Sequence, residues 1–274
     1  MIWRTWALLA LCGLVASGCA TPTIVNPTWA ELPAPDDMAD AYPGFAGIAG
    51  LPGQASLGCI GLADGRLANC EVVWEAPEGL GFGQAALQVA PRFRLSPRTV
   101  DGKAAKSRVR FNVRFLLPEI EIESAPPYDG PAPGVDRLAL ARPLAEKMMD
   151  SAWGAEEEFE LDVDEDRQAT VERIIAEADA EFEREQVGAL ALALARVLTP
   201  AQIESMNARQ MPDEPLPPIE DLYAAGAAEG FEISERYTER VRTKYCALYA
   251  CDPKWTGQRP RDLGYNQPGV EPGT

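Results

Sequence analysis

The sequence predicts an α+β fold: a small antiparallel sheet with packed helices, followed by a mainly α-helical domain. The first observation is SRVRFNVRF over 107–115, where polar and apolar residues alternate without a break, as in a half-buried strand. The second is the Asp64-Gly65 pair between two strand-like runs, a hairpin signal. The third is a shift to Ala, Leu and Glu after residue 134, which is typical of packed helices.

The chain opens with an export signal. Residues 1–18 hold one early arginine and an apolar run shorter than the roughly 20 residues of a spanning helix, so we expect a signal peptide. The VASGC stretch is similar to the lipobox of bacterial lipoproteins, with Ala16 where leucine is usual, and makes Cys19 the expected lipidation site. A soluble periplasmic protein cut near Ala20 is the alternative. Residues 19–41, rich in Pro, Ala and Asp, are expected to be an extended tether.

The small sheet is expected within 42–118. A short helix over 45–49 precedes the hairpin, and the glycine-rich GLGFG leads into a helix over 84–90. The last strand turns one apolar face to the core: Val109, Phe111, Val113 and Phe115. Its other face carries Arg108, Arg110, Asn112 and Arg114. This arginine stripe serves either ordinary solvation and protection of an exposed strand or a charge-specific contact.

Four cysteines remain once Cys12 in the signal and Cys19 are set aside. Export favours disulfides, and the simplest pairing is local: Cys59 with Cys70, and Cys246 with Cys251.

A two- or four-residue turn at Asp64-Gly65 places Cys59 opposite Cys70. We expect the four-residue turn over 63–66, because it suits a cross-strand disulfide better, whereas a three-residue loop would place Cys59 opposite Asn69. Closing this loop should contribute somewhat under about 3 kcal/mol.

After a linker over 119–134, the helical domain is expected to cover 135–251. The patterns predict helices over 135–152, 166–198 with a break near Gly188, 200–210, 219–228 and 234–250. Thr199-Pro200-Ala201-Gln202 is a capping-box start with proline at the first helical position. The tail, 252–274, is rich in Pro and Gly and is expected to be disordered.

Several kinds of chemistry are disfavoured. The chain has no histidine, which removes the usual catalytic triads and the commonest zinc ligand. The acidic run after 155 fails the calcium-loop pattern, because Arg167 and Arg173 stand where glycine and glutamate are needed. GLGFG lacks the lysine of a phosphate loop. A net charge of −17 disfavours nucleic acid. We therefore expect no cofactor, no metal and no enzymatic activity, with a carboxylate-based enzyme in the helical domain as a weak alternative.

The stretch 42–117, a little over a quarter of the chain, resembles the C-terminal domain of TonB-type proteins. The resemblance rests on Tyr42-Pro43, LGCIGLADGRLANCEVV, FGQAAL and FRLSPRTVDGKAAKSRVRFNVRF with its second turn at Asp101-Gly102, in the family's order. The flanking cysteines and the glycine-rich loop are similar to a disulfide-bearing branch. The resemblance implies a binding domain that adds a partner's extended segment to a sheet edge, with Arg108, Arg110, Asn112 and Arg114 on the edge strand favouring acidic segments.

The chain departs from energy-transducing members of that family. Such members keep an uncleaved N-terminal helix that commonly carries a histidine, whereas the apolar run of this chain is short and has none. A tether of about 20 residues reaches only about 70 Å, which is too short to cross a periplasm. We therefore expect a non-enzymatic cell-envelope lipoprotein that faces the periplasm and binds an envelope protein, such as a segment of an outer-membrane receptor. Ala20 after the lipidated cysteine favours the outer over the inner membrane. The alternative is a TonB-like energy-transduction component anchored by an uncleaved signal segment.

Overall fold

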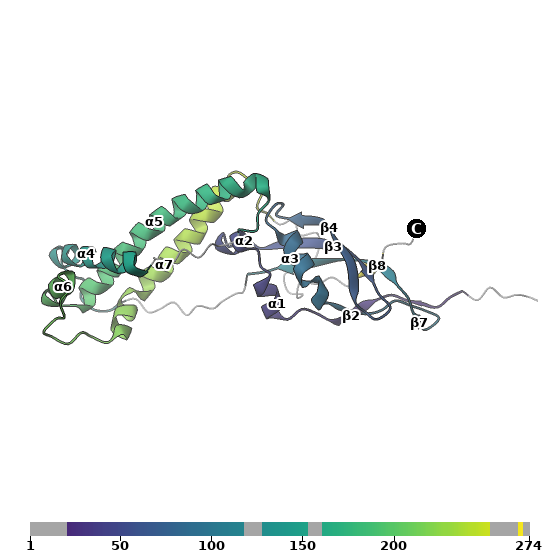
Figure 1. The fold of residues 1–274 in the computed structure, drawn as a ribbon, viewed down its shortest axis with the longest axis horizontal. Coiled ribbons are helices and arrows are strands. Elements are labelled where there is room, and N and C mark those ends of the chain that lie inside the picture. Colours follow the sequence, from purple (N-terminus) through teal and green to yellow (C-terminus); the bar gives the residue numbers. More distant parts are fainter. Residues whose placement is uncertain (1–20, 118–127, 153–160, 253–267, 271–274) are drawn as a thin grey trace, which may run out of the picture.

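The structure, a computed structural model, describes residues 21–117, 128–152, 161–252 and 268–270 (Figure 1). Helices and small antiparallel sheets make up a mixed fold, which confirms the α+β class. The strands form a body, comprising 21–117 and 268–270. Long helices form an arm, comprising 128–152 and 161–252, which extends from one end of the body (Figure 1).

The main sheet of the body has four strands in the order β4-β3-β8-β9. Their bounds are Gly53–Gly61 for β3, Leu67–Ala76 for β4, Ser107–Phe115 for β8 and Gly269–Val270 for β9. All pairings are antiparallel, and β3 pairs with β8 residue for residue over nine positions without a bulge. The alternating sequence of 107–115 therefore forms the predicted strand over its whole length.

The turn between β3 and β4 differs from the expected four-residue turn over 63–66. Leu62 N–H donates to the carbonyl of Arg66 at 2.8 Å, which closes a three-residue loop. Gly65 has φ of +84°, and a Cβ added to it would lie 2.3 Å from the carbonyl oxygen of Leu95. The loop is short because this glycine takes a left-handed conformation and lies against the backbone of Leu95.

A bulge in β4 restores the cysteine pairing that the short loop would otherwise break. The pairing register shifts between Gly58 and Ile60 of β3, and the extra residue on β4 is Asn69, with φ of +48°. Cys59 and Cys70 are consequently disulfide-bonded, with their Cα atoms 4.1 Å apart. The predicted hairpin disulfide is present, although the turn that was expected to supply it is not.

The segment expected to be an extended tether, 19–41, is largely folded onto the body. Its described part contains strands Ile24–Val25 (β1) and Thr28–Glu31 (β2) and helix Pro35–Asp40 (α1). β1 pairs with Thr99–Val100 (β6) and β2 with Arg94–Ser96 (β5), and β6 pairs on its other side with Lys103–Ala104 (β7). Trp29 of β2 packs 4.9 Å from the rings of both Phe93 and Phe111. The tether expectation was wrong because this aromatic side chain completes the core.

Helices cover one face of the main sheet. Gly44–Ile48 (α2) and Phe82–Val89 (α3), with the 3₁₀ turn Ala90–Arg92 (η1), pack with β2 around the apolar side chains of β3 and β8. Phe45, Phe82 and Phe111 are almost fully buried there. Both helices were expected, α2 from a short apolar stretch and α3 from the pattern after GLGFG.

The arm consists of four helices: Val135–Ala152 (α4), Glu165–Val197 (α5), Pro200–Asn207 (α6) and Ile219–Cys246 (α7). α5 and α7 lie side by side along the arm, and α4 and α6 pack at its far end (Figure 1). The expected breaks near Gly188 and between 228 and 234 are absent, because an isolated glycine costs a helix only about 1 kcal/mol and tertiary packing outweighs it.

The boundary expected between 42–118 and 135–251 does not coincide with a break in the packing. Val171, Ile174 and Ala178 of α5 and Val241 and Tyr245 of α7 belong to the same buried cluster as the phenylalanines of the sheet. A second cluster, built by α4, α6 and the later part of α5, fills the far end of the arm. The base of the arm is thus part of the body's core, and only its outer part has a core of its own.

Ion pairs join α5 to α7 along the arm. Arg196 lies 2.7 Å from Glu229, and Arg240 contacts Glu181 and Glu185 at 2.8 and 2.9 Å. The side chains of Arg196 and Glu229 are mostly buried. The hydrogen bond from Arg196 lowers the pKa of Glu229 below its usual value of 4.5.

Replacement of Glu229 by glutamine should therefore destabilise the chain by about 1 kcal/mol at neutral pH. A carboxylate with a lowered folded-state pKa stabilises above its unfolded value of 4.5, and that stabilisation is lost as the pH falls through the folded-state pKa. Urea unfolding of both proteins should show a free-energy difference that disappears well below pH 4.5. The more exposed Glu232→Gln is the control and should show a smaller difference; an undiminished Glu229 difference in acid would contradict the assignment.

Candidate protein-binding edge

The outer long strand of the main sheet, β8, is the predicted binding strand. Its apolar residues form the wall of the body's core and are all at most 2% exposed: Val109, Phe111, Val113 and Phe115. Phe111 packs between Trp29 and Phe93. One face of β8 packs against the core, and one of its backbone edges pairs with β3. Its other backbone edge faces away from β3.

The arginine stripe is shorter than expected. Arg108 and Arg110 are exposed and Asn112 is half-buried, as a solvent-facing side of the strand requires. Arg114 is only 8% exposed and lies opposite Gln54, itself 1% exposed, so this end of the second sheet face is covered. Placing Arg114 on the exposed stripe was therefore wrong, and the basic surface of β8 is confined to its beginning.

A short strand from the end of the chain lies on part of this edge. Val270 pairs with Val109 and Gly269 with Arg110, so β9 covers two positions of β8. Along 111–115 no described strand pairs with the outer side of β8. The expectation of disorder over 252–274 is corrected at 268–270; 253–267 and 271–274 lie outside the described residues.

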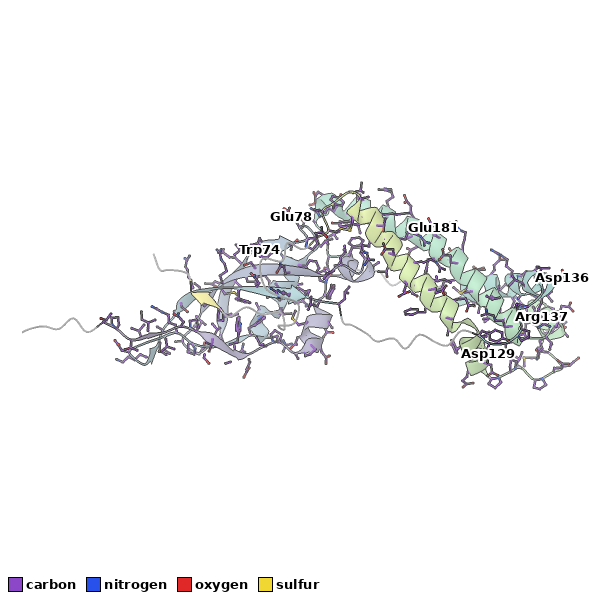
Figure 2. All side chains as sticks on the ribbon, turned by 180° about the vertical axis from the view of Figure 1, so that it is seen from behind. Trp74, Glu78, Asp129, Asp136, Arg137 and Glu181 are labelled. Carbon is purple, nitrogen blue, oxygen red and sulfur yellow. A yellow bond between two sulfur atoms is a disulfide. The ribbon has the colours of Figure 1, made fainter. Side chains whose placement is uncertain are left out.

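The opposite edge of the sheet is less regular. β4 carries two register shifts against β3, one at Asn69 and one at Val73, and bulges of this kind disturb the flat ladder that an added strand needs. Trp74 lies on this strand (Figure 2), and Val73 beside it is 38% exposed. Of the two edges, β8 presents the regular one.

An apolar depression lies at the Phe115 end of β8. It has a volume of about 300 Å³ and is lined by Tyr42, Pro43 and Ile48 around α2, and by Leu117, two residues beyond the strand. Tyr42 is held there by its hydroxyl, which donates to the carbonyl of Leu51 at 2.8 Å.

The glycine-rich loop, which raised the question of a phosphate site, encloses a carboxylate of the chain itself. Glu75 Oε1 accepts from Gly79 N–H at 2.6 Å and Leu80 N–H at 3.2 Å, and Oε2 accepts from Gly83 N–H at 2.5 Å. These N–H groups lie at the start of α3, where the helix dipole favours an anion. Glu75 therefore occupies the position that a bound phosphate would need.

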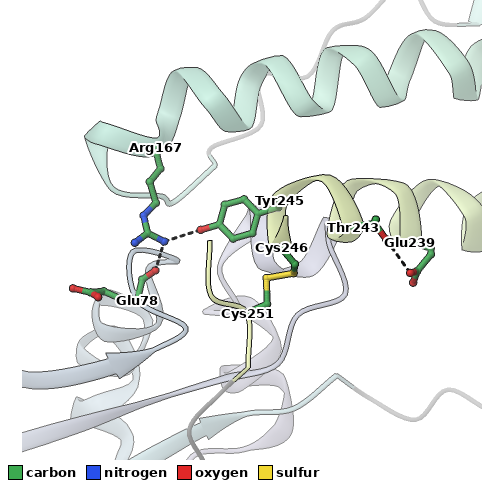
Figure 3. Close-up of a disulfide and its surroundings, with 7 residues drawn as sticks. All are labelled: Glu78, Arg167, Glu239, Thr243, Tyr245, Cys246 and Cys251. Carbon is green, nitrogen blue, oxygen red and sulfur yellow. Dashed lines mark hydrogen bonds between the residues drawn. A yellow bond between two sulfur atoms is a disulfide. The ribbon is translucent and has the colours of Figure 1, made fainter. Parts of the chain in front are cut away.

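The base of the arm is fastened to this loop (Figure 3). Arg167 of α5 donates to the carbonyl of Glu78 and, at 2.8 Å, to the hydroxyl of Tyr245 on α7, and its guanidinium also lies over the Tyr249 ring. Burial raises the pKa of Tyr245, so the phenol stays neutral. Next to it, Cys246 is bonded to Cys251 as predicted, with Cα atoms 5.4 Å apart.

Cys19, the expected lipidation site, lies outside the described residues. Within the described ranges, no three His, Cys, Asp or Glu side chains gather as a metal site would require. The helices of that same part of the chain include none with the length and apolar character needed to cross a membrane.

Sequence reasoning missed three features of this region: the pairing of β9, the carboxylate of Glu75 in the loop and the Arg167–Tyr245 contact. Only Glu75 had a local signal, since a carboxylate a few residues before a glycine-rich helix start can cap it. No protein-family model matches this chain, and neither does any curated protein sequence.

Proposed function

We propose that this chain is a non-enzymatic cell-envelope lipoprotein whose body binds an extended segment of a partner protein at the edge of β8. The observation that carries the proposal is the regular, bulge-free strand whose outer edge beyond Arg110 pairs with no described strand. Backbone hydrogen bonds would supply affinity for an added strand. The TonB-like resemblance of 42–117 supports the same mode of binding.

The surroundings of the edge suggest the chemistry of the partner segment. Arg108 and Arg110 favour acidic side chains on one side of an added strand, and the depression beside Leu117 accepts an apolar side chain at its end. The short β9 ladder covers only two positions, so a partner either binds beyond it or displaces it.

The envelope location rests on residues 1–19. Acylation at Cys19 would anchor the chain to a membrane facing the periplasm, with Ala20 favouring the outer membrane. A TonB-like transducer held by an uncleaved signal segment is the alternative. Loss of palmitate labelling and of signal cleavage in Cys19→Ala supports the lipoprotein, whereas an unchanged full-length protein in the inner membrane supports the transducer.

A photo-crosslinking residue at position 112 tests the edge in intact cells, and the same residue at position 71 on β4 is the matched control. We expect a discrete crosslinked species from position 112 that is absent from position 71. It should be strongly reduced when Arg108 and Arg110 are both replaced by glutamate. Equal crosslinking from both strands, or none from position 112, would overturn binding at β8.

A further inference from the structure

One stretch of this acidic protein is strongly basic. Residues 92–114 contain eight Lys and Arg and a single acidic residue, Asp101, giving the stretch a charge of +7. Since the whole chain carries −17, the remainder carries −24. Within this stretch, Lys103, Lys106 and Arg108 lie on β7 and around the beginning of β8, at one end of the body, whereas Arg92 pairs with Asp37 and the buried Arg114 lies at the other end of β8.

The positive side chains at this end are available to a ligand. Lys103 on β7, Lys106 and Arg108 are exposed, and within the described ranges none of them forms an ion pair. Asp101 is engaged instead with the backbone of Thr23, accepting its N–H at 2.9 Å while the Asp101 N–H donates to the Thr23 carbonyl at 2.8 Å.

Apolar side chains are exposed in the three-stranded sheet β1-β6-β7, which contains Lys103. Ile24 and Val25 of β1 pair with β6, which in turn pairs with β7, and their exposed fractions are 50% and 55%. Exposed aliphatic residues next to unpaired lysines are typical of surfaces that bind lipid bilayers, where the apolar groups enter the interface and the cations meet anionic headgroups.

The position of this surface in the molecule points the same way. The arm leaves the body at the end opposite β7 (Figure 1), so nothing in the arm covers the basic end. Thr23 is fixed to Asp101 only four residues after Cys19, a distance of at most about 14 Å of extended chain. An acyl group on Cys19 would hold this end, and no other part of the body, against the membrane.

We infer that the β1-β6-β7 end of the body is a membrane-binding surface that recognises anionic phospholipid headgroups in a bilayer. This goes beyond partner binding at β8 and does not require acylation. Nucleic acid would use the same cations, but it would not use Ile24 and Val25, and the −24 of the remainder would repel a long duplex.

Vesicle flotation tests the inference with the unacylated chain from residue 20 onward, which keeps every described residue. The chain should float with vesicles of phosphatidylcholine containing about 30% phosphatidylglycerol and not with pure phosphatidylcholine. Raising NaCl from about 0.05 to about 0.5 M should release it. A 20-base-pair duplex of DNA as competitor, used at about equal phosphate concentration, should not displace it.

Charge reversal locates the surface. Lys103→Glu with Lys106→Glu should weaken vesicle binding about ten-fold or more, because both lie at the basic end. Arg184→Glu with Arg209→Glu, an equal change at two exposed arm positions, should leave binding within about two-fold. Unchanged far-UV circular dichroism shows that both variants fold.

Each other outcome counts against the inference. Absence of flotation with phosphatidylglycerol, equal weakening by the arm variant, or displacement by DNA overturns it. Its fate is separate from that of the proposed function, since a chain that binds these vesicles but gives no crosslink from position 112 would keep the membrane surface and lose the β8 edge.

Discussion

Tyr245→Ala is expected to lower the free energy of unfolding by about 3–5 kcal/mol. Tyr245 is fully buried, and its ring packs 4.9 Å from Phe45 of the body and 4.8 Å from Tyr249. Truncation would leave a cavity at the base of the arm and remove the hydroxyl that accepts from Arg167.

Two probes of urea unfolding would measure this effect. Far-UV circular dichroism follows mainly the long helices of the arm, and tryptophan fluorescence includes Trp29 and Trp74 of the body. The two transitions should coincide in the parent protein, because one core joins arm and body, and separate in Tyr245→Ala. Tyr245→Phe, which keeps the ring, should lose only about 1–2 kcal/mol. Equal losses in the two variants would mean that the ring's packing is unimportant.

Glu75→Ala is expected to destabilise the body by about 2–4 kcal/mol. The carboxylate accepts three backbone N–H groups, and hydrogen bonds to a charged group are the stronger kind. Without it the start of α3 loses its anion, and the loop that contacts Arg167 loses its internal support.

Thermal unfolding of Glu75→Ala and of Glu71→Ala distinguishes this role from a general effect of charge. Glu71 lies on the same strand, is exposed and removes the same charge, so its loss should change stability by less than about 0.5 kcal/mol. Added phosphate or sulfate should partly restore Glu75→Ala and leave Glu71→Ala unchanged, because an anion can occupy the vacated N–H groups. Equal destabilisation of the two variants would contradict the assignment.

Local patterns predicted the parts of the fold that local forces decide. The helix over 135–152 has the bounds expected from its periodicity, and Thr199 and Gln202 form the predicted capping box at the start of α6. The strand over 107–115 was equally clear, since its alternation is unbroken. Breaks expected at isolated glycines were wrong, because α5 and α7 support each other along the arm.

The remaining features depend on contacts between distant segments. Trp29 gave no period in the sequence, yet its place beside Phe111 orders the segment that was expected to be a tether. A two-residue strand such as β9 has no pattern to detect, and Arg114 differs from Arg108 only in what covers it. The strand of the candidate site and the alternation of its side chains were predictable, and so were both disulfides, whereas the extent of the edge that no described strand covers was not.

The shared core at the base of the arm also has a mechanical consequence. α5 has 33 residues and is therefore about 50 Å long. With a lever of that length, a rotation of about 10° at the base displaces the far end by about 9 Å. Arg167 joins Tyr245 to the carbonyl of Glu78 at the base of the arm. A small change in the geometry of these contacts would therefore produce a larger displacement at the far end of the arm, around Asp136 and Arg137 (Figure 2).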